Sequence, residues 1–98
     1  MVKVTLNGTT LAESTDTVVV EGNHYFPPGS IKKEYFKDSD THTTCSWKGE
    51  ASYYTLQPPS GAAVPDAAWY YPQTHDTERA KKIEGYVAFY KNKVQITE

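Results

Sequence analysis

Apolar and polar residues alternate along much of the chain, which is the pattern of strands with one buried face. Residues 2–6 read Val-Lys-Val-Thr-Leu, so every second side chain is apolar. The pair Asn7-Gly8 follows this run, and residues 9–14 form a second run behind it. Both turn residues tolerate positive φ, so the chain is predicted to open with a two-residue β-hairpin.

Further short runs rich in β-branched and aromatic residues predict more strands, separated by turn-forming residues. The expected strands are residues 17–21, 24–26, 41–47, 51–56, 66–71, 86–90 and 94–96. The last two are expected to pair as a hairpin across residues 91–93. Pro27-Pro28 should end the strand predicted at residues 24–26, because proline has no N–H to donate to a neighbouring strand.

The remaining segments predict little helix. Residues 29–37 are expected to be irregular or 3₁₀, residues 38–40 a turn, and residues 57–65 an exposed loop. A single short helix is expected at residues 77–83, with Asp76 as its cap and Gly85 as its stop. Many short strands with at most one small helix predict an all-β domain, as a barrel or as two packed sheets.

Size and charge narrow the class of protein. The 98 residues are enough for one domain, residues 1–98, and 13% of them are aromatic. The net charge of −2 is spread along the chain and provides no basic surface for nucleic acid or for a membrane. No signal peptide or bilayer-spanning run is visible, and one cysteine cannot form an internal disulfide. We expect a soluble cytoplasmic protein.

Candidate chemistry concentrates in residues 41–54, which contain His42, the only cysteine Cys45, Trp47 and Lys48. A thiol enzyme would need His42 or Lys48 to lower the pKa of Cys45. Three residues apart on a strand, however, His42 and Cys45 face opposite sides, and Lys48 does so too unless the turn rotates it. Close Cys or His pairs are missing, so we expect neither a metal site nor a cofactor.

Four segments that together cover the chain almost end to end resemble one family, the domain of unknown function 427. The segments that carry the resemblance are Glu21-Gly22-Asn23-x-Tyr25-Phe26-Pro27, Thr44-Cys45-x-Trp47-Lys48-Gly49-x-Ala51-Ser52-Tyr53-Tyr54, Ala68-Trp69-x-Tyr71-Pro72 and Ile83-x-Gly85-Tyr86-Val87-Ala88-Phe89. The resemblance implies a small β-tent-like fold of two antiparallel sheets. Such a fold is similar to methionine-R-sulfoxide reductases and to the thalidomide-binding domain of cereblon.

A nucleotidyltransferase heading is sometimes attached to this family. Such enzymes pair a Gly-Ser with two carboxylates that hold Mg²⁺, and Gly29-Ser30 with Asp38-Ser39-Asp40 has a superficial likeness to that motif. The carboxylates should stand on a rigid strand, whereas residues 37–41 are predicted to be a polar turn. The likeness therefore gives a weaker hypothesis than the aromatic residues do.

Aromatic rings can stack on flat ligands and attract cations, and a lysine beside a glycine at a strand end can reach an anion. We therefore predict a small-molecule binding domain whose ligand is not identified. Its alternatives are an enzyme, nucleotidyltransferase-like or thiol-dependent, and a protein-interaction domain. The rings are equally suited to filling the core of a leucine-poor domain. The predicted ligand-binding residues are Tyr25, His42, Cys45, Trp47, Lys48, Tyr54, Trp69 and Tyr71.

Overall fold

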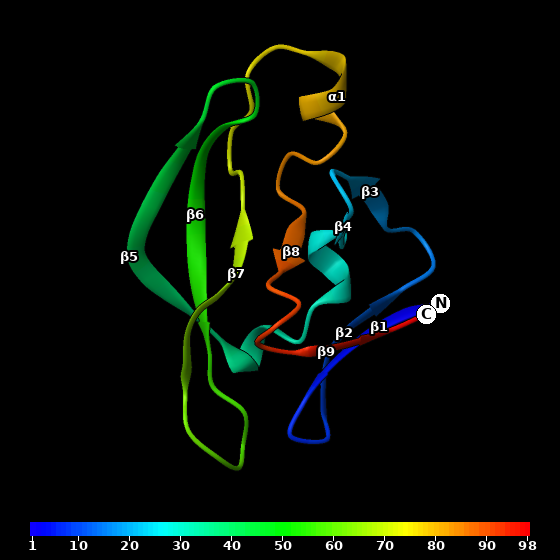
Figure 1. The fold of residues 1–98 in the computed structure, drawn as a ribbon, viewed down its shortest axis with the longest axis vertical. Helices are drawn as coiled ribbons and strands as arrows, with labels where there is room; N and C mark the ends of the chain where they lie inside the picture. The colour runs from blue at the N-terminus through cyan, green and yellow to red at the C-terminus, as the bar shows by residue number, and fades with distance from the viewer.

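The computed structural model describes residues 1–98 as short strands with little helix (Figure 1). The strands are β1 (Val2–Leu6), β2 (Thr9–Ser14), β3 (Val18–Val20), β4 (Asn23–Tyr25), β5 (Phe36–Cys45), β6 (Gly49–Leu56), β7 (Val64–Tyr70), β8 (Val87–Phe89) and β9 (Gln95–Thr97). The helical segments are the 3₁₀ turns η1 (Pro28–Ser30) and η2 (Lys33–Tyr35) and the α-helix α1 (Glu78–Lys81). The all-β prediction is confirmed.

Three antiparallel sheets are present where the resemblance implied two. Their strand orders are β2-β1-β9, β3-β4 and β5-β6-β7-β8. Phe26 and Val87 exchange two backbone hydrogen bonds of 2.8 and 2.9 Å, which attach the β3-β4 hairpin to the edge of β8. Pro27-Pro28 follows at once and cannot extend this ladder, so the hairpin remains a sheet of its own.

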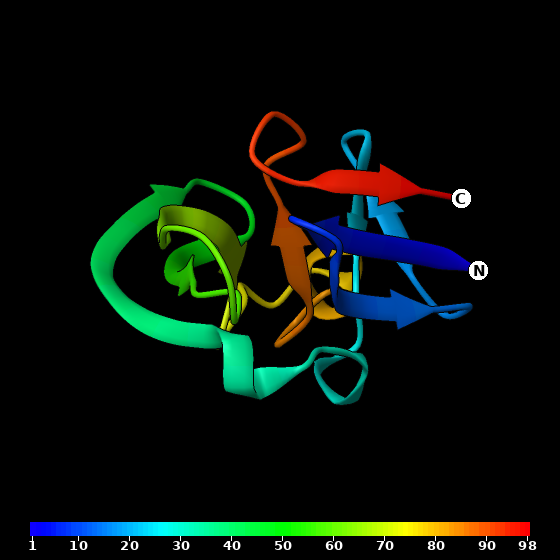
Figure 2. The same ribbon diagram turned by 90° about the horizontal axis from the view of Figure 1, so that it is seen from below.

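The opening hairpin is confirmed, and the predicted closing hairpin is wrong. Asn7 and Gly8 have φ of 51° and 80°, as a tight hairpin turn requires. β9, however, pairs with β1 instead of β8, with Ile96 opposite Val4. This pairing lets Ile96 pack against the apolar cluster that contains the fully buried Val4. The two ends of the chain therefore lie side by side (Figures 1 and 2).

Residues 38–40 are not the predicted turn, because they belong to the long edge strand β5. The hydroxyls of Ser39 and Thr41 donate hydrogen bonds to the carboxylate of Asp66 on β7. These hydrogen bonds hold the pKa of Asp66 below its usual value. The pairing with β6 shifts between Asp38 and His42, and β5 is strongly curved in Figure 2. An edge strand tolerates polar side chains, because its outer side faces solvent.

The single α-helix is shorter than predicted and begins one residue later. Thr77, instead of Asp76, is its cap, and the Thr77 hydroxyl accepts a 3.2 Å hydrogen bond from the Ala80 N–H. The helix ends at Lys81 with Lys82 as its C-cap, so the predicted stop at Gly85 is wrong, although Gly85 does have a positive φ of 79°. None of the helical segments has the length and apolar character that crossing a bilayer demands.

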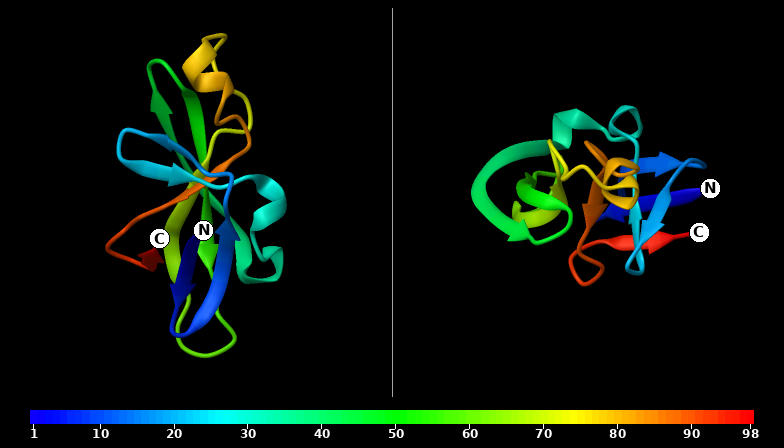
Figure 3. Two further views of the ribbon diagram at one scale, coloured as in Figure 1. Left: turned by 90° about the vertical axis from the view of Figure 1, so that its right-hand side faces the viewer. Right: turned by 90° about the horizontal axis from the view of Figure 1, so that it is seen from above.

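Two apolar clusters cover the two faces of the four-stranded sheet. On β8, Val87 and Phe89 belong to the first cluster and Ala88 to the second, because neighbouring strand residues point to opposite faces. The three-stranded sheet lies on one side of β8, and the curved strands β5 and β6 lie on the other (Figures 2 and 3). The first cluster contains Val2, Val4, Leu11, Ala12, Phe26, Ile31, Leu56, Ala67, Ala68, Val87 and Phe89. The second contains Val20, Tyr25, Ala51, Tyr53, Trp69, Tyr71, Ile83 and Ala88.

Candidate functional site

Lys48 lies in the turn between β5 and β6, and its side chain folds onto the second cluster. Only 7% of the residue is exposed. Its ammonium lies 5.0 Å from the ring centre of Trp47 and 5.5 Å from that of Tyr71, and it donates a hydrogen bond to the carboxylate of Glu21. Glu21 reaches it from the β3-β4 turn, where Glu21 and Gly22 both have positive φ. The aromatic cluster thus already holds a cation of its own chain.

The electrostatics of this pair favour the charged form of both partners. The hydrogen bond from Lys48 holds the pKa of Glu21 below its usual value, and the guanidinium of Arg79 adds to this. Burial acts to lower the pKa of Lys48, but its hydrogen bond to Glu21 and neighbouring charges outweigh burial and raise the pKa. The Arg79 guanidinium also lies 4.9 Å from the ring centre of Trp47. The two cations near Trp47 therefore share Glu21 as their counter-charge.

Two further predicted ligand residues, Tyr25 and Trp69, form the interior of the same cluster. Their rings meet edge to face with centres 6.3 Å apart. The indole N–H of Trp69 donates a 3.3 Å hydrogen bond to the Tyr25 hydroxyl. Tyr25 is fully buried and Trp69 is 8% exposed. Both polar groups are thus satisfied inside the protein, and these rings serve as core.

Tyr54 and His42 lie away from the other predicted ligand residues. Tyr54 stacks on Tyr70 with ring centres 4.7 Å apart, and it packs against the first cluster. His42 pairs with Ser52 and faces the same side as Tyr54, with 3.3 Å between His42 Nδ1 and the Ser52 hydroxyl. Alternation along β6 accounts for this, because Tyr53 and Tyr54 must point to opposite faces. The predicted set is therefore divided between two faces.

Cys45 is a free, partly exposed thiol that packs against the second cluster. His42 faces the other side of the sheet, as strand alternation predicted. The β5-β6 turn does rotate Lys48 to the side of Cys45, but its ammonium is bound to Glu21. No three His, Cys, Asp or Glu side chains are grouped so that they could hold a metal ion. Neither of the two bases considered from the sequence is thus free to activate the thiol.

The carboxylates of the nucleotidyltransferase-like motif stand on a strand, contrary to the predicted turn. Asp38 and Asp40 are exposed on the edge strand β5, and Gly29-Ser30 lies in η1. The Ser30 hydroxyl donates to the carbonyl of Pro27 and so caps a local turn. The two serines of the motif, Ser30 and Ser39, therefore make hydrogen bonds within this fold.

An open pocket of about 520 Å³ lies beside Lys48, between the start of β6 and the segment 72–75. The backbone connects the two features, because the carbonyl of Lys48 accepts a 3.0 Å hydrogen bond from the His75 N–H. The residues that line the pocket are Gly49, Glu50, Pro72, Gln73, Thr74 and His75. Sequence analysis did not single out residues 72–75, whose composition is that of an ordinary loop.

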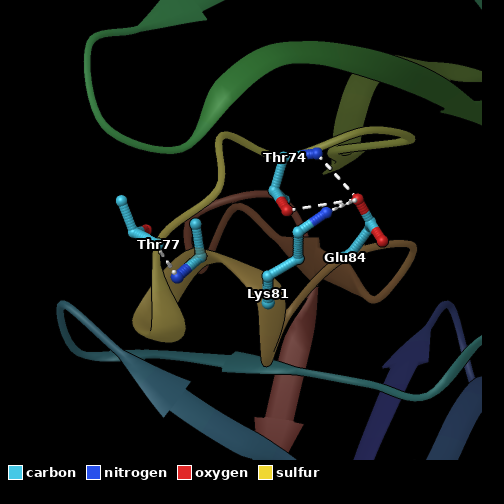
Figure 4. A network of polar contacts seen from close by, with 5 residues as sticks. Thr74, Thr77, Lys81 and Glu84 are labelled. Carbon is cyan, nitrogen blue, oxygen red and sulfur yellow. Dashed lines mark hydrogen bonds and ion pairs between the residues drawn. The ribbon is translucent and has the colours of Figure 1, made fainter.

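The wall formed by residues 72–75 is fixed from both sides. Gly49 has φ of 121°, and a Cβ at this position would lie 2.9 Å from the carbonyl oxygen of Gln73, so only glycine permits this approach. On the other side, one carboxylate oxygen of Glu84 accepts hydrogen bonds from the N–H and hydroxyl of Thr74, at 2.9 and 3.2 Å (Figure 4). Lys81 donates to the same oxygen at 3.3 Å. Chiefly because of the Thr74 N–H, the pKa of Glu84 lies below its usual value.

Three polar side chains of the pocket have no partner within the chain. Glu50, Gln73 and His75 are all exposed. The ion pairs of the structure are His24 with Glu98, Lys48 with Glu21 and Lys81 with Glu84, so none includes Glu50 or His75. Hydrogen-bonding groups held on a fixed wall are available to a molecule that enters from solvent.

The fold and this site define a small all-β domain with a lysine-filled aromatic cluster and an adjoining polar pocket. The chain belongs to the family described as Domain of unknown function (DUF427), whose model matches residues 1–98. The family resemblance read from the sequence is confirmed. No curated protein matches the chain. The family description names no activity, so the function has to be argued from the site itself.

Proposed function

We propose that this domain binds a small molecule in the open pocket between β6 and residues 72–75. The observation that carries the proposal is the pocket itself, whose volume of about 520 Å³ lies in the range of small-molecule sites. Its walls are fixed by Gly49 and Glu84, so little ordering of the protein is needed when a ligand enters.

The aromatic and lysine cluster has a supporting role in this proposal. Lys48 holds the pocket wall through its carbonyl, while its side chain is fixed by Glu21, Trp47 and Tyr71. A rigid interior behind the wall keeps the polar groups in place for the ligand. The ligand thus contacts Glu50, Gln73 and His75, and the rings determine where these groups stand.

The two alternative functions have less support. A thiol enzyme would need a base at Cys45, and the imidazole of His42 faces the other side of the sheet. An interaction domain would be expected to expose a contiguous apolar patch. Only three large apolar residues are exposed, namely Met1, Val19 and Tyr90.

The test is a binding screen followed by mapping on the labelled protein. A ligand that binds only the folded state raises the melting temperature, so thermal shifts identify candidates in a library of polar metabolites. Amide resonances of residues 49–50 and 73–75 should then move on titration, and His75→Ala should weaken binding. His42→Ala is the matched control, because it removes an exposed imidazole on another face. Shifts confined to other residues would contradict the proposal.

A further inference from the structure

We propose that the ligand of this pocket is a small hydrophilic cation, a primary amine that carries further hydrogen-bonding groups. The inference rests on the proposed binding function and adds the chemical class of the ligand. Three features of the pocket support it: its uncompensated charge, its excess of hydrogen-bond acceptors and the absence of hydrophobic residues from its lining.

The charge of the pocket comes from Glu50. Two lysines that adjoin the pocket walls have other partners, since Lys48 is paired with Glu21 and Lys81 with Glu84. Arg79 lies over the ring of Trp47. Glu50 lines the pocket without a counter-charge, so the pocket attracts cations and repels anions.

The free hydrogen-bonding groups favour a ligand that donates. A carboxylate such as that of Glu50 only accepts, while the Gln73 amide and the His75 ring can each accept as well as donate. The hydroxyl of Thr74 is already committed as a donor to Glu84. An ammonium group offers three donors and no acceptor, which complements this set.

The lining also limits the size and polarity of the ligand. None of the six lining residues belongs to the apolar clusters, and the His75 imidazole is the only aromatic ring among them. A bulky apolar group would gain little burial here, because the pocket is open and no hydrophobic residue lines it. A molecule about as large and as polar as a monosaccharide suits the volume of about 520 Å³.

Three sugars of one ring size separate the effect of charge from that of shape. Glucosamine is a cation at neutral pH, glucose is neutral and glucuronate is an anion. Titrations of the ¹⁵N-labelled protein should give glucosamine roughly three- to tenfold tighter binding than glucose, as expected for one charge-assisted hydrogen bond at an exposed site. Glucuronate should bind most weakly. Added salt should reduce the preference for glucosamine.

Substitutions at Glu50 assign the preference to this residue. Glu50→Gln should lower the affinity for glucosamine to that for glucose, whereas Glu50→Asp should keep a preference because it keeps the charge. Glu34→Gln removes an exposed carboxylate in η2 and is the matched control, which should bind as the unmodified protein does. Amide spectra of each variant show whether it is folded.

The outcomes distinguish this inference from the function on which it rests. Equal binding of the three sugars, tighter binding of glucuronate, or a preference that survives in Glu50→Gln would each overturn the assignment of a cationic ligand. If no amine moves the pocket resonances but another library compound does, the pocket is a binding site of a different class. If no compound moves them, the proposed function fails together with the inference.

Discussion

The ammonium of Lys48 and the carboxylate of Glu21 join two turns that are 27 residues apart in the sequence. One turn connects β3 to β4 and the other connects β5 to β6, so the pair ties the small hairpin to the large sheet over the second cluster. The partners are unequally buried, with 9% of the Lys48 side chain exposed against 52% of the Glu21 side chain.

This inequality predicts different effects for the two single substitutions. Glu21→Gln leaves a buried ammonium without its anion and should reduce the free energy of unfolding by about 1.5 kcal/mol. Lys48→Met keeps most of the buried stem and leaves a carboxylate that water can solvate, so it should change stability by less than about 1 kcal/mol. Urea unfolding monitored by tryptophan fluorescence measures both values.

The double variant Glu21→Gln with Lys48→Met provides the control for this prediction. Because the methionine has no charge to satisfy, the added Glu21→Gln change should cost little in the Lys48→Met background. Equal losses from Glu21→Gln in both backgrounds would show that the ion pair is not the cause.

The contribution of Glu21 should also depend on pH. Its pKa is lowered in the folded state from the usual 4.5, so folding favours the ionised form. The stabilisation is therefore complete above about pH 4.5 and is lost as pH falls through the lower folded-state pKa. The difference in unfolding free energy between the unmodified protein and Glu21→Gln should shrink as pH falls below about 4.5. A difference that does not change as pH falls would show that ionisation of Glu21 does not contribute to the free energy of unfolding.

Gly49→Ala should damage both stability and the pocket. The new Cβ would lie 2.9 Å from the Gln73 carbonyl oxygen in a backbone with φ of 121°. We expect a loss of about 2 to 3 kcal/mol and a displacement of residues 72–75, visible as faster amide exchange at His75. Gly29→Ala is the control, because nothing lies within 4 Å of its Cβ position and its φ is not positive. That variant should be neutral or slightly more stable.

Alkaline unfolding should report on Tyr54. Burial, with contributions from Tyr70 and Asp38, raises the pKa of Tyr54 from 10.0 to about 12. The unfolded state therefore loses its proton first, and stability falls as pH rises from about 10 to about 12. Tyr54→Phe should show a shallower fall over this range in urea unfolding at a series of pH values. If the free energy of unfolding falls equally with pH in Tyr54→Phe and in the unmodified protein, ionisation of Tyr54 is not the cause of the fall.

Local signals in the sequence predict local structure well in this chain. The Asn7-Gly8 turn specifies its hairpin through the φ values of two adjacent residues. The failures involve partners that are distant in sequence. The carboxylate of Asp66 accepts hydrogen bonds from Ser39 and Thr41 and so stabilises them in a strand. The residues next to 38–40 in the sequence give no sign of this distant partner. Strands of three residues, such as β8 and β9, carry too little pattern to select their partners.

The candidate site shows the same limit. Residues 41–54 drew attention because of Cys45, Trp47 and Lys48, and the structure places these three residues against one cluster. Alternation alone predicted that His42 would face away from Cys45. Two other features depend on tertiary contacts, which the local sequence does not predict. They are the pairing of Lys48 with Glu21 and the wall formed by residues 72–75.

The pairing of β9 with β1 has a consequence for how the chain reaches this fold. Lys3 lies opposite Thr97, so the central strand of the three-stranded sheet gains its second neighbour from residues that a ribosome adds more than ninety positions later. During synthesis β1 can form only its hairpin with β2, and one edge of it stays unpaired. Completion of this sheet therefore has to wait until residues 95–97 have left the ribosome, and until then the free edge of the β1-β2 hairpin is open to chaperones and to mispairing.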